Sequence, residues 1–147
     1  LDIGAAIAGG TSDQHAALAA YGEPLGRAFQ WRDDLLGVFG DGELTGKQTG
    51  EDLREGKLTL LVARAFAGST PSGAERLASV FGRSELTADD VDAVREIIVA
   101  SGAQRHVEDA IERELEVALD ALQGAPLTAD GLTALRALAD AAVRRSF

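Results

Sequence analysis

The chain has 147 residues, enough for one domain with a hydrophobic core, and no cysteine, which excludes disulfides, thiolate metal sites and a cysteine nucleophile. Its formal net charge of −10 argues against a nucleic-acid partner, because such binding depends on Lys and Arg side chains that neutralise phosphates. No apolar run reaches the roughly 20 residues that span a bilayer, and no signal-peptide pattern is present. We therefore expect one domain over residues 1–147, without a membrane span and compatible with the cytoplasm.

The composition favours helices, because alanine and leucine dominate and aromatic side chains are few. The first segment, residues 1–7, reads like the inside of a helix, and the chain has no methionine at its start. We therefore expect that an upstream part of the protein is missing. A long helix is predicted next, from Ser12 to Phe39, with Ser12 or Asp13 as its N-cap and a bend near Pro24.

A glycine-rich stretch follows from Gly40 to Gly56, and short helices are predicted over 57–66 and 74–81. Thr87 and Asp90 form the pattern of a capping box at the start of another helix. Ser101 and Gly102 interrupt that helix, a longer one runs to residue 122, and Thr128 can cap the last. Because no stretch alternates with β-branched residues, the sequence predicts an all-α fold.

The end of the long helix carries a polar face between apolar side chains. At about 100° per residue, one face holds Gln30, Asp33, Asp34, Gly37 and Asp41. Large apolar residues border this face on both sides: Trp31, Leu35 and Val38 on one, Leu36 and Phe39 on the other. The pattern indicates a helix inside a bundle with its carboxylates directed into a cavity, although an isolated Asp-Asp pair near a helix end is more often a surface feature.

Two adjacent buried carboxylates repel each other and are tolerated when a cation holds them or when one is protonated. Oxygen ligands suit Mg²⁺, which is often shared with substrate phosphates. The only two lysines of the chain, Lys47 and Lys57, each follow a glycine in the next segment, where an ammonium can neutralise phosphate oxygens. The alternative is a flexible surface loop with solvated lysines. A P-loop and an EF-hand both fail on spacing.

These residues form one continuous motif, Phe29-Gln30-x-x-Asp33-Asp34-x-x-x-x-x-Gly40-Asp41 followed by Gly46-Lys47-x-x-Gly50-x-Asp52-Leu53-x-x-Gly56-Lys57-x-Thr59. The motif resembles the trans-isoprenyl diphosphate synthase (polyprenyl synthetase) family, and the flanking helical segments resemble its C-terminal half. The resemblance implies a bundle of antiparallel helices around a central cavity. It also implies an enzyme that uses Mg²⁺ to condense an allylic diphosphate with isopentenyl diphosphate, usually as a homodimer.

By this resemblance Asp33 and Asp34 belong to the second of two aspartate-rich motifs and bind the metal together with Asp41. Lys47 would contact the allylic diphosphate, and Gln30 and Lys57 would line the substrate site. The same resemblance assigns Asp33, Asp34 and Lys47 to catalysis.

One position departs from the family pattern. The third aspartate of the second motif is replaced by Gly37, so we expect Asp33 to be the main metal anchor and Asp34 to be secondary. The departure leaves open a catalytically silent partner subunit of a prenyl synthase. A class I terpene cyclase is a further alternative, but Gly37 and Asp41 stand where its Ser/Thr and Glu are needed. The family's first aspartate-rich motif lies upstream of this chain, so we predict that this segment alone is inactive.

Overall fold

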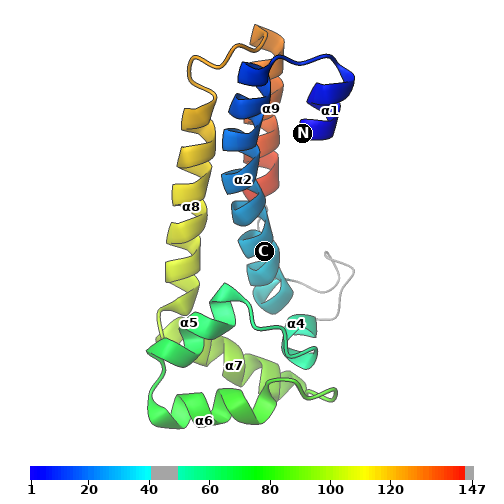
Figure 1. Cartoon of the computed structure of the whole chain (residues 1–147). Helices are drawn as coiled ribbons and strands as arrows, with labels where there is room; N and C mark the ends of the chain where they lie inside the picture. Colours follow the sequence, from blue (N-terminus) through cyan, green and yellow to red (C-terminus); the bar gives the residue numbers. More distant parts are fainter. Residues whose placement is uncertain (41–49, 145–147) are drawn as a thin grey trace. The chain divides into compact units, whose positions relative to one another are not determined.

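The computed structural model describes residues 1–40 and 50–144, and within these ranges the chain forms helices and no strand (Figure 1). The prediction of an all-α fold is therefore confirmed. Two residues of the predicted site, Asp41 and Lys47, lie outside the described ranges. Among the described helices, none is both long and apolar enough to cross a membrane.

The chain divides into two units by its internal contacts. One unit combines Leu1–Gln30 with the residues from Ala110 onward, and the other consists essentially of Trp31–Asp109. Each unit is therefore described separately, and the expected single domain over residues 1–147 stays a prediction.

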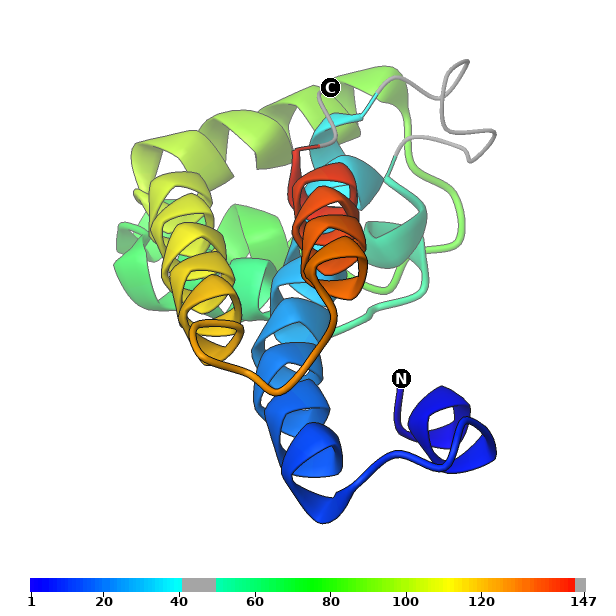
Figure 2. The same cartoon turned by 90° about the horizontal axis from the view of Figure 1, so that it is seen from above.

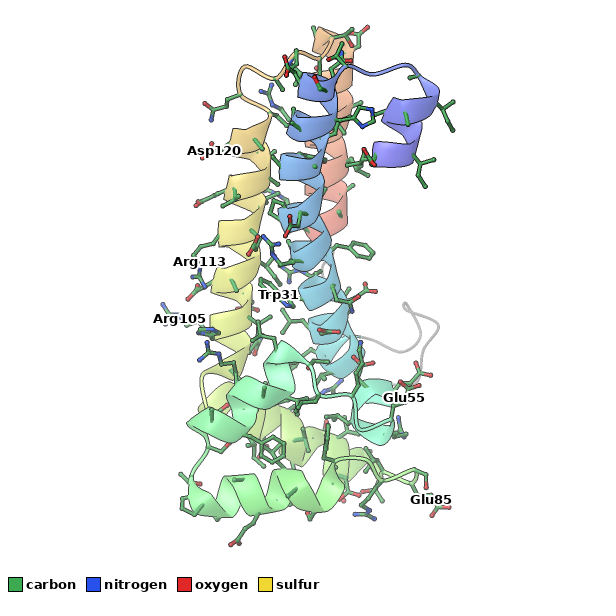
Figure 3. The ribbon with its side chains drawn as sticks, in the orientation of Figure 1. Trp31, Glu55, Glu85, Arg105, Arg113 and Asp120 are labelled. Carbon is green, nitrogen blue, oxygen red and sulfur yellow. The ribbon has the colours of Figure 1, made fainter. Side chains whose placement is uncertain are left out.

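In the first unit, part of α2 (Ser12–Phe39) lies beside α9 (Ala129–Val143) and the second half of α8 (Ala103–Ala121), as Figures 1 and 2 both show. The Tyr21 hydroxyl is buried and donates a 2.7 Å hydrogen bond to the Leu135 carbonyl. Figure 3 shows Arg113 and Asp120 on the side of α8 that faces away from α2. The amphipathic pattern of α8 thus sorts its side chains as expected, with apolar residues inside and charges outside.

The short helix α1 (Asp2–Ile7) belongs to the same unit and confirms the helical reading of the N-terminal segment. It is joined to α2 by a 2.6 Å contact between the Asp2 carboxylate and Nδ1 of His15. His15 therefore has a structural partner in the described part of the chain.

The second unit contains α4 (Glu51–Arg54), α5 (Leu60–Gly68), α6 (Pro71–Val80), α7 (Ala88–Ala100) and the start of α8. Helices α5, α6 and α7 pack against one another around apolar side chains that are at most 2% exposed: Leu53, Leu61, Val62, Leu77, Val80, Val94 and Ile98. Phe66 and Phe81 add an edge-to-face contact, with ring centroids 6.1 Å apart. Arg95 of α7 donates a 2.8 Å hydrogen bond from Nε to the Val38 carbonyl, which joins this part of the unit to the end of α2.

Capping residues set the helix starts, and two predicted boundaries were wrong for this reason. The Thr59 hydroxyl accepts a hydrogen bond from the Val62 amide, so α5 begins at Leu60 and not at residue 57. Thr70 caps α6 and Pro71 occupies its first turn, so that helix begins earlier than residue 74.

Two other local predictions were confirmed. Thr87 and Asp90 exchange hydrogen bonds of 3.1 Å each in a complete capping box. The break at Ser101-Gly102 also occurs, because Gly102 adopts a φ of 74°.

Candidate active site

The last turns of α2 carry one buried and one half-buried carboxylate. Asp34 is 4% exposed, whereas the neighbouring Asp33 is half-buried. Leu35 and Val38, which flank them on the helix, are at most 1% exposed. The apolar border recognised in the sequence therefore corresponds to a helix whose acidic face is at least partly enclosed, which argues against the reading of Asp34 as an ordinary surface acid.

The buried Asp34 carboxylate is neutralised by Lys57. Its Oδ1 accepts a 2.9 Å hydrogen bond from Lys57 Nζ, although the two residues are far apart in the sequence. The side chain of Asp34 is only 6% exposed, so an ionised carboxylate needs a partner of opposite charge there. The same hydrogen bond, opposed by partial burial, raises the pKa of the Lys57 ammonium above its usual value.

The segment between α4 and α5 places Lys57 next to the end of α2. The helix α4 consists of a single turn that ends at Arg54, with Glu55 as its C-cap. Gly56 follows with a φ of 66°, a conformation that glycine adopts readily. This turn folds the chain back, so that the Lys57 amide donates a 3.0 Å hydrogen bond to the Asp52 carbonyl. The glycine that precedes Lys57 thus has a backbone role, and Lys57 is held next to the acidic end of α2.

Asp52 is a second carboxylate on the same ammonium, and the sequence analysis assigned it no role. Its Oδ2 lies 3.4 Å from Lys57 Nζ. Asp52 also lies against Gly37, because a Cβ atom added to Gly37 would be 3.0 Å from Asp52 Oδ2. The signal was present in the sequence, since Asp52 belongs to the motif that contains Lys57, but only the structure shows that Asp52 lies beside Lys57 and Gly37.

The other predicted residues are less informative. Gln30 is exposed and lies one helical turn before Asp34 on α2. Asp41 and Lys47 stay predictions because the structure does not describe them. Residues 1–40 and 50–144 contain no group of three or more His, Asp or Glu side chains that could enclose a metal. The carboxylate oxygens of Asp33 and Asp34 are ligands of the kind that Mg²⁺ takes, an ion that also retains waters and shares phosphate oxygens.

Comparisons with known proteins agree with the motif. A sequence model of the family described as polyprenyl synthetase matches residues 1–98. Geranylfarnesyl diphosphate synthase of Aeropyrum pernix is 38% identical over 144 residues, which are 97% of this chain and 44% of that protein. Octaprenyl diphosphate synthase of Escherichia coli is 38% identical over 143 residues, which are 95% of this chain and 42% of that protein.

Solved structures give the same result. Geranylgeranyl pyrophosphate synthase of Corynebacterium glutamicum, crystallised with isoprenyl diphosphate and magnesium, superposes with a TM-score of 0.92 at 40% identity. The matched region covers 97% of this chain and 41% of that one, so the chain spans less than half the length of these relatives. By its sequence, its fold and the motif at the end of α2, the chain belongs to the polyprenyl synthetase family.

Proposed function

We propose that the protein containing this chain is a trans-prenyltransferase that condenses an allylic diphosphate with isopentenyl diphosphate. In this proposal the chain supplies the second aspartate-rich motif. The observation that carries the proposal is the buried carboxylate of Asp34, which lies next to Asp33 on α2. Its Oδ1 accepts a 2.9 Å hydrogen bond from Lys57 Nζ. Relatives named as geranylfarnesyl, geranylgeranyl and octaprenyl diphosphate synthases support the reaction class.

Mg²⁺ is the proposed cofactor. The carboxylates of Asp33 and Asp34, with Asp41, would hold it, and related structures crystallised with magnesium or calcium support a divalent cation. Bound there, Mg²⁺ would neutralise charge that develops on the departing diphosphate. Because Asp34 already accepts a hydrogen bond from Lys57, its geometry supports the assignment of Asp33 as the main anchor and Asp34 as secondary.

The chain's own side chains have distinct roles in this proposal. Lys47 would bind the allylic diphosphate as a point charge. The Lys57 side chain, which is 44% exposed, would supply a second positive charge to the diphosphate. Gln30 would line the substrate site. Leu35 and Val38 are buried on the same helix as the carboxylates, and in this proposal they would help to keep water away from a reacting carbocation.

The direct test is an assay of the purified full-length protein. It is incubated with labelled isopentenyl diphosphate, allylic primers of increasing length and Mg²⁺, and the products are separated by chain length. We expect products that are longer than the primer by multiples of five carbons, and no product in EDTA. A folded protein that forms no elongated product with any of the primers would contradict the proposal.

Gly37 favours a second candidate, a silent partner subunit of a prenyl synthase, because the family's third aspartate is absent there. The contact between Gly37 and Asp52 weakens this alternative, since an acidic group lies where that side chain would begin. The two candidates differ in one measurement. A silent subunit gives turnover only after it is mixed with an active synthase, whereas an enzyme, which we expect to sediment as a homodimer, acts alone.

A further inference from the structure

We propose that Gly37 and Asp52 work as a pair. The absence of a side chain at position 37 makes room for the Asp52 carboxylate, and Asp52 positions Lys57 so that the ammonium is shared and Asp34 stays available to a second cation. Asp52 is thus a positioning residue. The inference rests on the proposed function, because it concerns the same site.

The first step is steric. A Cβ atom at position 37 would lie 3.0 Å from Oδ2 and 3.2 Å from Cγ of Asp52, closer than ordinary carbon contacts. The backbone fixes this approach as well, because the Gly50 amide donates a 3.1 Å hydrogen bond to the Gly37 carbonyl. α4 is therefore docked on α2 at a point where only a hydrogen atom projects from α2.

The second step concerns charge. The Asp52 side chain is 16% exposed and that of Asp34 is 6% exposed, so both carboxylates are largely removed from water. Lys57 Nζ lies 2.9 Å from Asp34 and 3.4 Å from Asp52. One ammonium thus serves two acids unequally. If the Lys57 ammonium moves slightly toward Asp52, its hydrogen bond to Asp34 weakens, but the ammonium still has a carboxylate partner.

The consequence follows from competition. A cation that approaches Asp34 competes with the Lys57 ammonium for the same carboxylate. With Asp52 present, the Lys57 ammonium keeps a partner when it moves away from Asp34. The site also carries one more negative charge than it would without Asp52. Without Asp52, Lys57 and the cation compete directly, so a higher Mg²⁺ concentration is needed.

The experiment uses the full-length protein and four variants, Gly37→Ala, Asp52→Ala, their double variant and Asp52→Asn. The metal-free readout is thermal unfolding in EDTA. Gly37→Ala should lower the melting temperature in the wild-type background, because the methyl group displaces the Asp52 carboxylate. In the Asp52→Ala background the same change should raise it by about 2 °C, because the clash is gone and alanine favours the helix.

The second readout is the Mg²⁺ concentration that gives half-maximal prenyl transfer. We expect Gly37→Ala, Asp52→Ala and Asp52→Asn each to raise it by about tenfold, and the double variant to be no worse than either single variant. A purely structural role would lower turnover without a selective change in the Mg²⁺ requirement.

Two controls match these variants. Gly26→Ala adds a methyl group to the same helix at a position where a Cβ atom meets nothing within 4 Å, so it should be stabilising in every background. Glu51→Gln removes an acidic charge from α4 and should leave the Mg²⁺ requirement unchanged.

The outcomes separate the two hypotheses. A wild-type protein without prenyl transfer would refute the proposed function, while the unfolding series would still test the pair. If the wild type is active but Gly37→Ala has the same effect on melting with and without Asp52, or Asp52→Asn leaves the Mg²⁺ requirement unchanged, the pairing is overturned and the function stands.

Discussion

Two buried aspartates in the same unit, Asp34 and Asp90, have different sets of hydrogen-bond partners. Asp90 is 8% exposed and accepts hydrogen bonds from the Thr87 amide at 3.1 Å and from Arg76 at 2.7 Å. The backbone bond from Thr87, followed by the Arg76 bond, lowers its pKa to about 2. Its carboxylate is therefore fully committed to the start of α7, and Asp90 has a structural role.

Asp34 is buried to a similar degree, but it accepts a hydrogen bond from a lysine that also contacts a second carboxylate, that of Asp52. Lys57 and Arg76 are about equally exposed, at 44% and 41%, so the two sites differ in the sharing of the cation and not in its exposure. The comparison teaches that burial alone does not identify a candidate functional carboxylate. What distinguishes Asp34 is that its cation is shared with a second carboxylate.

The largest expected difference between the two sites concerns activity. Asp33→Ala in the full-length protein should lower prenyl transfer by about 100-fold or more, because the proposed main metal anchor is lost. Asp90→Asn, assayed below its melting temperature, should retain most of the activity. Normal Mg²⁺ dependence in Asp33→Ala would show that the metal is held elsewhere.

Removal of the Lys57 ammonium should show how much the buried negative charge of Asp34 costs in stability. Lys57→Met leaves Asp34 without this partner and should lower the stability by about 1 kcal/mol in EDTA, a value reduced because the ammonium is partly exposed. Mg²⁺ should then raise the melting temperature of Lys57→Met more than that of the wild type. The double variant Asp34→Asn/Lys57→Met is the control, and its response to Mg²⁺ should be smaller.

The pH dependence of this pair has a definite sign. The pKa of Lys57 is raised above its ordinary 10.5, so its contribution to stability is complete below pH 10.5 and disappears as the pH rises through the raised value. The difference in unfolding free energy between the wild type and Lys57→Met should therefore shrink only in strong alkali. A difference that already vanished near neutral pH would exclude the ion pair as its source.

The Asp90 site should respond at the acidic end of the scale. Its pKa is lowered from 3.8 to about 2, so its contribution to stability is present above pH 3.8 and is lost as the pH falls toward 2. Urea unfolding of the wild type and Asp90→Asn between pH 2 and pH 7 checks this. Equal differences at both ends would mean that the carboxylate's charge is unimportant.

The smallest expected effect is on the cap itself. Thr87→Ala removes the hydroxyl that accepts a 3.1 Å hydrogen bond from the Asp90 amide, and should lower the stability by about 1 kcal/mol without a change in the Mg²⁺ requirement. A shift in that requirement would indicate that the start of α7 is coupled to the acidic end of α2.

Several features of the fold could be predicted because their causes are local. The bounds of α2, the capping box at Thr87 and the break at Gly102 depend on residues within a few positions of each other. The single turn of α4 could not be predicted, because a helix of four residues carries too little periodicity. The starts of α5 and α6 differ from the predicted ones because the side chains of Thr59 and Thr70 cap these helices.

The sequence by itself determined the helical class, the family and the acidic face that contains Asp33 and Asp34, because these depend on composition, periodicity and a continuous motif. Only the tertiary structure decided which cation neutralises Asp34 and which carboxylate lies against Gly37. The physical reason is that these contacts depend on the docking of α4 on α2, which a backbone hydrogen bond between Gly50 and Gly37 fixes across a turn of the chain. A spacing rule within one helix contains no information about such an approach.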